Sequence, residues 1–453
     1  MTAVRKSAPV NRMRRFVADY GMLGILVLLC LFFSILTLRD QYPTGDKAAS
    51  ELVKEINSAD STSGTLIVCG DNPLDREFAE ALEGKLRQRG QTIVGILVGD
   101  PGFVRAGMSG LGDSVRFVQL IVTTQSFAPV VRSIIGEIPV LSAARIATPP
   151  SYRWPTFLLA DNVRNVANQI TVIAIIAIGM TMVIITAGID LSVGSLIALS
   201  AVVTAWLIGS LGGDNASSWA MFISGVGGIL LCGAIGAFSG FMITRFRIPP
   251  FIATLGMMQV AAGVAYIISQ GKPIYQIPSG FVLLGRGAEP LLRIPHAVIV
   301  MVALYVLAHI VMTRTTLGRY IYAVGGNAEA ARLSGVRVGG ILLLVYTLCG
   351  LLAGLGGVIM ASQLKSGAPT YGLTYELYVI AAVVVGGTSL SGGEGRIFGT
   401  LIGAFIIAVI QNGMNLTNVE TYTQKVVLGL VILGAVLLDR LKQGRFRRRR
   451  LQS

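Results

Sequence analysis

The chain has 453 residues, of which 53% are hydrophobic and only 13% are charged, and 55 of them are glycine. Several uncharged runs are long enough to cross a hydrocarbon core as helices. This composition excludes an ordinary soluble protein and predicts a polytopic membrane protein.

The formal net charge of +14 points to an anionic partner. Residues 39–165 hold 13 Lys/Arg and 14 Asp/Glu, so the basic excess lies in the tails and in short loops between apolar runs. That distribution follows the positive-inside rule. The arginine-rich run 445–450 directly follows an apolar run, where anionic lipid headgroups are the nearest partner. We therefore predict contact with a lipid membrane and no nucleic acid.

The sequence shows no pattern typical of a catalytic or metal site. Its four cysteines are scattered, and its two histidines, His296 and His309, bracket one apolar run. No metal-ligand spacing is present, and neither a Ser/His/Asp set nor paired carboxylates on a soluble face can be found. We therefore predict no catalytic residues, no metal and no cofactor on this chain.

The N-terminal region predicts a cytoplasmic tail followed by a membrane helix. Residues 1–19 are polar and basic, and residues 20–38 form an apolar run. No small-residue cleavage site follows this run, so we expect a retained first transmembrane helix rather than a removed signal peptide. The basic flank places the N-terminus in the cytoplasm, and hence residues 40–155 in the periplasm.

Residues 40–155 differ from the rest of the chain in composition and hydrophobic pattern, and they predict a small α/β domain. Apolar strands alternate with amphipathic helices, which implies a parallel sheet covered on both faces. The expected helices are 47–58, 73–90 and 127–136, and the expected strands are 64–69, 92–98, 118–123 and a short edge strand at 138–141.

Residues 156–440 predict a bundle of membrane helices, followed by a basic cytoplasmic tail at 441–453. Together with the first helix there are about ten spans, which puts both termini in the cytoplasm. The expected spans lie near 168–187, 192–211, 217–243, 251–269, 296–312, 339–361, 374–390, 397–414 and 423–439.

The stretch 168–211 is the most informative part of the sequence. An uncharged run breaks at Gly188-Ile-Asp-Leu-Ser-Val-Gly-Ser195 and resumes at once. An acid this close to lipid is costly unless it faces a bundle interior or water, so Asp190 is a functional candidate. Asp190 or Ser192 could equally cap the helix that follows. The two interpretations are compatible, and both stay open here.

Glu376 is the second acid expected close to membrane depth, near the start of the span at 374–390. Two such acids could carry protons, which keeps a proton-coupled secondary transporter of a small polar solute as the alternative function. Nearby, Leu390-Ser-Gly-Gly-Glu394 mimics the signature of an ATPase, but the chain has no phosphate-binding loop. We interpret the segment 386–396 as a tight turn or a broken helix packed inside protein.

The loop 313–338 is the longest expected cytoplasmic loop after the first helix. Within it, residues 327–335 read as a short helix that Asn327 caps and Gly335 stops. The alternative interpretation of this loop is a solvated connector.

Two segments resemble the permeases of ribose-type sugar ABC importers. The first is "GMTMVIITAGIDLSVGS" at 179–195, and the second is "VVVGGTSLSGGEGRIFGTLIGA" at 383–404. The likeness runs from about residue 156 to 441 together with the first helix. The insert separately resembles one lobe of a periplasmic sugar-binding protein, through Asn72-Pro73 and Glu137-Ile-Pro-Val140 among other short matches.

This resemblance implies an all-α permease subunit of an ATP-binding-cassette importer in the inner membrane, which translocates a simple sugar (ribose-, xylose- or galactose-like). It implies three partners: an ABC ATPase that binds ATP on a separate chain, a periplasmic sugar-binding protein, and a second permease in a homodimer or heterodimer. The candidates for the translocation pathway or gate are Asp190, Ser192, Ser195, Ser391 and Glu376. The positions matching the family's ATPase-coupling loop are Asn327, Glu329, Ala330, Ala331 and Gly335.

Overall fold

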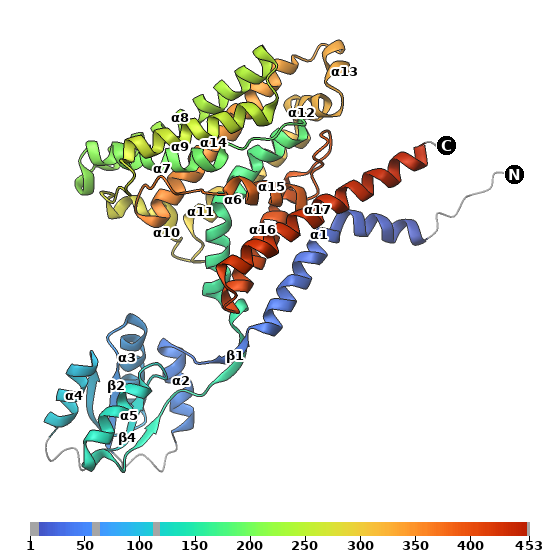
Figure 1. Ribbon diagram of the computed structural model, residues 1–453. Helices are drawn as coiled ribbons and strands as arrows, with labels where there is room; N and C mark the ends of the chain where they lie inside the picture. The colour runs from blue at the N-terminus through green and yellow to red at the C-terminus, as the bar shows by residue number, and fades with distance from the viewer. Residues whose placement is uncertain (1–8, 57–63, 112–117, 451–453) are drawn as a thin grey trace. The chain divides into compact units, whose positions relative to one another are not determined.

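The computed structural model describes residues 9–56, 64–111 and 118–450 (Figure 1). The first eight residues of the expected N-terminal tail and the last three of the C-terminal tail lie outside these ranges. The chain divides into two compact units. Unit 1 contains the residues up to Thr37 and those from Phe157 onward, and unit 2 is Leu38–Thr156.

Unit 1 is a helical bundle, and the predicted helical polytopic fold is confirmed. Within the described residues, seven helices are long and apolar enough to cross a membrane, and three further apolar segments are shorter: Gly21–Leu36, Tyr375–Val385 and Thr421–Leu437. The helices of unit 1 are α1 (Pro9–Leu36), α6 (Ala160–Ile185), α7 (Val193–Ser210), α8 (Ser218–Phe246), α9 (Pro250–Ser269), α10 (Leu283–Arg286), α11 (His296–Arg314), α12 (Thr316–Gly326), α13 (Ala328–Leu333), α14 (Val338–Leu364), α15 (Tyr375–Val385), α16 (Ile397–Leu416) and α17 (Thr421–Arg450).

Helices α6 and α14 form the centre of the bundle. The most apolar window of α6 is 89% buried, whereas that of α9 is only 17% buried. Helix α14 packs against α6, α7 and α8. Glycines let two of these backbones touch, since a Cβ at Gly236 of α8 would lie 3.2 Å from the Cα of Gly350 in α14. Helices in lipid associate in this way, because small residues permit close approach.

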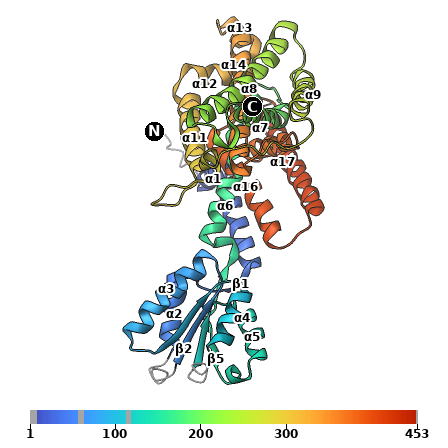
Figure 2. The same cartoon turned by 90° about the vertical axis from the view of Figure 1, so that its left-hand side faces the viewer.

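Unit 2 is a four-stranded parallel sheet with helices on both faces, as the alternation of strands and helices predicts (Figure 2). The strand order is β3-β2-β4-β5. Side chains alternate along β2: Ile67 and Cys69 pack with α2 and α3, whereas Leu66 and Val68 pack with α4 and α5. The elements are α2 (Gly45–Glu55), β2 (Gly64–Cys69), α3 (Pro73–Gln88), β3 (Ile93–Val98), α4 (Pro101–Gly110), β4 (Val118–Thr123), α5 (Ala128–Glu137) and β5 (Arg145–Ala147).

The two ends of unit 2 pair with each other. Strand β1 (Leu38–Gln41) runs antiparallel to β6 (Tyr152–Pro155), with Leu38 opposite Pro155. At the adjoining edge of unit 1, the backbone N–H of Phe157 donates a hydrogen bond of 3.1 Å to Thr37 Oγ1. The chain therefore leaves and re-enters unit 1 at neighbouring positions.

Two predictions for unit 2 need correction. The expected edge strand at 138–141 is a short 3-10 helix, Pro139–Leu141, and the edge strand is β5 instead. Pro139 explains the error, because its ring fixes φ and it has no N–H to give to a sheet. Helix α4 was not predicted, although Asp100 caps it by accepting a hydrogen bond from the N–H of Phe103 at 2.8 Å.

Candidate functional site

The break between α6 and α7 encloses Asp190, which has no exposed surface. Helix α6 ends at Ile185, and Ala187 then takes a left-handed conformation with φ of 60°. The Oδ1 atom of Asp190 accepts two hydrogen bonds from Ser192, one from its N–H at 2.9 Å and one from its hydroxyl at 2.6 Å. The Ser192 hydroxyl donates to Asp190 and accepts no capping bond from the first turn of α7. The cap interpretation is therefore wrong for Ser192, and Asp190 stabilises a turn ahead of the helix.

Polar groups of α14 lie beside the Asp190 carboxylate, namely the Tyr346 hydroxyl and the Cys349 thiol. By geometric criteria, neither Asp190 Oδ2 nor the Tyr346 hydroxyl has a hydrogen-bond partner within the described part of the chain. A Cβ at Gly188 would overlap the Tyr346 hydroxyl, so this hydroxyl lies directly against the break. A buried acid with one unsatisfied oxygen is typical of a functional position.

The depth of the break follows from its neighbours in α14. Cys349 is the twelfth of the 27 residues of this helix, which at 1.5 Å per residue is long enough to span a membrane. Asp190 therefore lies close to the middle of a spanning helix.

Thr254 of α9 holds the backbone of the break, a role that the sequence analysis did not identify. The Leu191 N–H donates to Thr254 Oγ1 at 3.1 Å, and the hydroxyl lies 3.3 Å from the Ile189 carbonyl. It also reaches the Pro250 carbonyl in its own helix at 3.0 Å. No signal in the sequence could have found it, because the two partners are more than 60 residues apart.

Glu376 reaches the first turn of α7 from a different helix. A Cβ at Gly194 would overlap its carboxylate and would lie 2.6 Å from the Gly372 carbonyl oxygen. Glu376 itself is half-buried and belongs to the first turn of α15, after Thr374 in a left-handed conformation with φ of 68°. An acid at the start of a helix is favourable, because the free N–H groups there carry partial positive charge.

The structure thus brings four of the five pathway candidates to the start of α7, one of them Glu376 from α15. Asp190 and Ser192 are fully buried, whereas Ser195 in the first turn is half-buried. Ser391 lies elsewhere, exposed in the turn between α15 and α16, and its N–H bonds the Ser389 hydroxyl at 3.2 Å. The start of α7, lined by two acids and two serines, is the candidate functional site.

The loop expected to contact an ATPase contains two helices, α12 and α13 (Figure 1). Asn327 caps α13 by accepting a hydrogen bond from the Ala330 N–H at 2.9 Å, and Gly335 follows the helix with φ of 87°. Both features agree with the sequence. Ala331 packs inward, whereas Glu329 and Ala330 are exposed and Leu333 is 80% exposed. Helix α13 therefore presents a small free surface.

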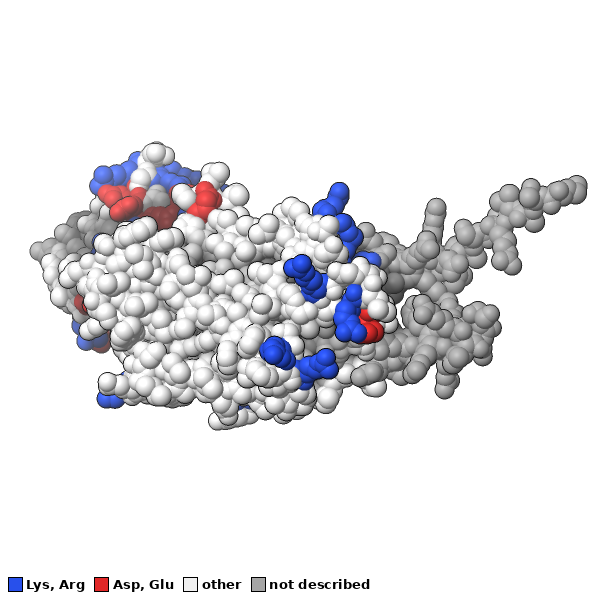
Figure 3. Space-filling model, turned by 90° about the horizontal axis from the view of Figure 1, so that it is seen from above, with Lys and Arg blue, Asp and Glu red and all other residues white. Residues whose placement is uncertain are grey.

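Exposed basic side chains are present on unit 1. Figure 3 shows one face of the molecule, on which separate Lys and Arg side chains stand at the margin of a largely uncharged surface. Within α13, Arg332 forms an exposed ion pair of 2.5 Å with Glu329. Further exposed arginines lie in the last turns of α8 and α11, after α8, in α12 and before α14: Arg245, Arg314, Arg247, Arg319 and Arg337.

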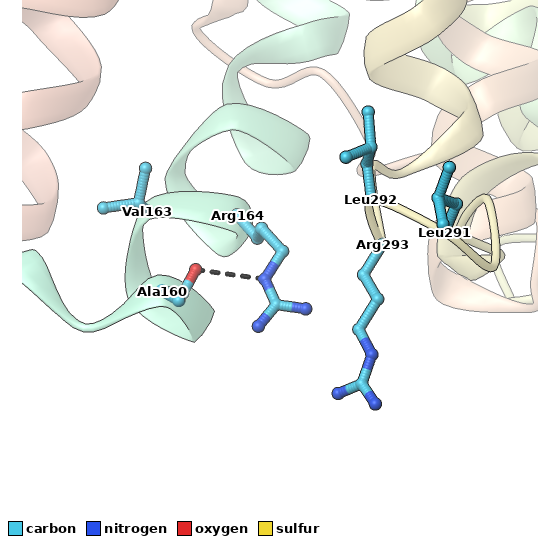
Figure 4. Close-up of a pocket in the computed structure, with 6 residues that line it drawn as sticks. All are labelled: Ala160, Val163, Arg164, Leu291, Leu292 and Arg293. Atoms are coloured by element: carbon cyan, nitrogen blue, oxygen red, sulfur yellow. Dashed lines mark hydrogen bonds between the residues drawn. The ribbon is translucent and has the colours of Figure 1, made fainter.

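A shallow pocket of about 460 Å³ lies apart from these residues, between the start of α6 and the loop before α11 (Figure 4). Two arginines and several apolar side chains line it, and Arg164 is held by the Ala160 carbonyl at 3.1 Å and by Asp161 at 2.7 Å. It contains none of the candidate residues. Among the residues that the structure describes, no group of three His, Cys, Asp or Glu side chains could hold a metal ion.

Comparison with known proteins identifies the family of the chain. Residues 162–436 match the family described as "Branched-chain amino acid transport system / permease component". The chain belongs to this family of transport permeases. Unit 2 lies outside the matched range. The permease is a multi-pass protein of the inner membrane.

Three relatives show which proteins the permease is similar to. It is 46% identical to the ribose import permease protein RbsC of Escherichia coli (strain K12) over 294 residues, which cover 64% of this chain and 88% of that protein. It is 45% identical to RbsC of Bacillus subtilis (strain 168), covering 64% and 87%, and 40% identical to the D-allose transport system permease protein AlsC of Escherichia coli (strain K12), covering 63% and 85%. No solved structure matches the chain.

Proposed function

We propose that the permease is the membrane subunit of an ATP-binding-cassette importer that carries a simple sugar, ribose-, xylose- or galactose-like, into the cell. The observation that carries this proposal is the 46% identity to a ribose import permease over 88% of that protein's length. Relatives named for allose and arabinose support the same substrate class. ATP hydrolysis belongs to a separate ATPase chain, so the permease itself is not an enzyme and holds no cofactor.

The chemistry at the start of α7 supports a polyhydroxylated substrate. Carboxylates accept hydrogen bonds from hydroxyl groups, and serine hydroxyls both donate and accept them. Of the polar groups there, Ser195 and Glu376 are half-buried and could reach a solute, whereas Asp190 is fully buried. Asp190 therefore braces the backbone of the gate, and Ser195 and Glu376 line the passage.

The arrangement of α7 and α15 supports a passage at this point. Helix α7 has 18 residues and α15 only 11, and their first turns meet at Gly194 and Glu376. Transporters commonly bind their substrates where such discontinuous helices begin in the middle of the membrane.

The exposed surface of α13 supports docking of the ATPase. Glu329, Ala330 and Leu333 would contact the partner, Asn327 and Gly335 would fix the ends of the helix, and Ala331 anchors it to the bundle. The exposed arginines around α13 favour a cytoplasmic position, with both termini on the same side and unit 2 in the periplasm. A periplasmic binding protein would deliver the sugar, and two permeases would pair, as a homodimer or a heterodimer.

Uptake into proteoliposomes tests this function. The full-length permease with its cognate ATPase and binding protein should accumulate labelled ribose, xylose or galactose when ATP is supplied. Collapse of the proton gradient should leave uptake unchanged, because neither acid at α7 needs to carry a proton. Uptake that follows the proton gradient and ignores ATP would instead establish a secondary transporter.

A further inference from the structure

Three backbone segments meet at the carboxyl end of α6. Gly325, in the last turn of α12, lies against the Ile185 carbonyl so closely that a Cβ there would overlap the oxygen and would stand 2.7 Å from the Gly393 nitrogen. The same carbonyl accepts a hydrogen bond from the Gly393 N–H at 2.8 Å. One carbonyl oxygen of α6 is thus shared by α12 and by the turn between α15 and α16.

Two further contacts hold the segments together. The Tyr322 hydroxyl, one turn earlier in α12, donates a hydrogen bond of 2.7 Å to the Gly395 carbonyl. A Cβ at Gly392 would lie 2.9 Å from the Gly325 oxygen and 3.1 Å from the Ala187 nitrogen. At Gly325, Gly392 and Gly393 the neighbouring backbones meet directly, with no side chain between them. We call this contact the glycine joint: Gly325 against Ile185, Gly392 and Gly393.

The glycine joint stands between the two candidate regions of the permease. On one side, Gly325 is two residues before Asn327, which caps α13, and the Asn327 N–H bonds the Ala323 carbonyl of α12 at 3.0 Å. On the other side, Ile185 is five residues before Asp190. Only short stretches of ordered backbone therefore separate α13, the joint and the break at α7.

We infer that Gly325 is a positioning residue that transmits movement of α13 to the break between α6 and α7. A tightly packed contact has few intermediate arrangements, so a displacement on one side moves the other rather than being absorbed. This inference rests on the proposed function, since it requires that α13 be moved by an ATPase. The glycine joint transmits the displacement of α13 to the end of α6, and the turn 386–396 holds α12 against that end.

The adjacent residue provides a matched control. Gly326 is exposed, lies in the same last turn of α12, and has no heavy atom within 4 Å of the position of its Cβ. Gly325→Ala and Gly326→Ala therefore make the same chemical change one residue apart. The first forces the backbones of the joint to separate, and the second adds a methyl group in open space.

The test measures sugar uptake and ATP hydrolysis together, with the full-length permease, its ATPase and its binding protein in proteoliposomes and labelled ribose as the probe. We expect Gly325→Ala to lower the sugar carried per ATP hydrolysed by about tenfold, with the complex intact and hydrolysis retained. Gly326→Ala should keep the wild-type ratio. A normal ratio in Gly325→Ala would overturn the inference, as would a parallel loss of uptake, hydrolysis and thermal stability, which indicates a purely structural role.

Tyr322→Phe keeps the test decisive if Gly325→Ala does not assemble. It removes only the hydroxyl that bonds the Gly395 carbonyl, so we expect a ratio lowered by about threefold in a folded complex. An unchanged ratio in this variant would overturn the inference. The wild-type protein separates the two proposals. If it shows no ATP-driven uptake of labelled ribose, xylose or galactose, the proposed function itself fails. If wild-type uptake is normal and the variants are unaffected, only the inference about the glycine joint is rejected.

Discussion

Asp190 combines one satisfied oxygen with one that has no partner within the described residues, and this asymmetry separates its structural role from its functional role. Its Oδ1 atom holds the turn before α7 through Ser192, as an amide oxygen could do equally well. The Tyr346 hydroxyl and the Cys349 thiol lie beside the carboxylate. Burying an acid with an unsatisfied oxygen is costly, so an acid at this depth indicates a functional position.

We therefore predict that Asp190→Asn lowers sugar uptake by about tenfold or more while thermal stability is unchanged or higher. The amide keeps the acceptor for Ser192 and removes the carboxyl oxygen that has no partner, so folding does not suffer. Asp190→Ala should lose both uptake and stability, since it also removes the two hydrogen bonds. Normal uptake by the Asn variant would leave Asp190 with a structural role only.

Cys69 in unit 2 offers a prediction on reactivity. It has no exposed surface, and burial, followed by the nearby charge of Asp75, raises the pKa of its thiol to about 12. Only the thiolate reacts with maleimide-type reagents, and a raised pKa means that less thiolate is present at a given pH. We expect no labelling of Cys69 at about pH 8 in the folded permease, and labelling once unit 2 is unfolded in denaturant. Rapid labelling of the native protein would show that unit 2 opens readily.

Which site residues the sequence could predict depended on how far apart in the chain the contacting residues lie. Asp190, Glu376 and the cap at Asn327 were found because an acid in an apolar run and a cap before a short helix are local signals. Thr254 and Tyr346 were not found, because their contacts with the break come from helices far along the chain. The same reason hid the approach of Glu376 to α7.

At the scale of elements, α13 is the short helix with the most direct consequence. Glu329 pairs with Arg332 on its exposed face, and its first turn carries no other acid. We predict that Glu329→Arg uncouples ATP hydrolysis from uptake while the permease stays folded and inserted, because the substitution repels Arg332 and reverses the charge that the ATPase would meet.

The matched control for this variant is Glu420→Arg, an exposed acid in the loop between α16 and α17. It makes the same change of charge outside the proposed docking surface and should leave the uptake per ATP unchanged. If Glu329→Arg transports normally, the loop 313–338 is a connector and has no part in the mechanism.

In unit 1 the positions of the membrane helices were easier to predict than which of these helices are buried. The most apolar windows of α6 and α9 are similarly apolar, yet 89% of the α6 window and only 17% of the α9 window is buried. On a helix exposed to water, polar residues recur with the helical period and identify the exposed face. On a helix exposed to lipid, the exposed face is apolar like the buried one, so the sequence pattern does not distinguish them. The sequence therefore located the spans and left open which of them form the centre. It also began α6 near residue 168, although the helix starts at Ala160.

At the scale of the whole molecule, the topology makes a prediction that a single labelling experiment checks. Lys54 lies in α2 of unit 2 with 66% of its side chain exposed. In intact spheroplasts, Lys54→Cys should react with an impermeant maleimide, because a helix with a basic cytoplasmic flank precedes unit 2. The matched position is Gly326→Cys, which is exposed beside α13 and should react only after the inner membrane is breached. The opposite pattern would reverse the orientation of the permease.

The paired strands β1 and β6 determine how unit 2 can vary in evolution. The four matched residue pairs from Leu38–Pro155 to Gln41–Tyr152 bring together the two ends of a segment longer than a hundred residues. Closing such a segment costs little more than closing a much shorter one, since the entropy lost grows only with the logarithm of its length. In terms of closure entropy, unit 2 therefore joins α1 and α6 much as a short hairpin would. A change in length beyond the two strands therefore need not displace α1 and α6, which stay joined by the same four residue pairs.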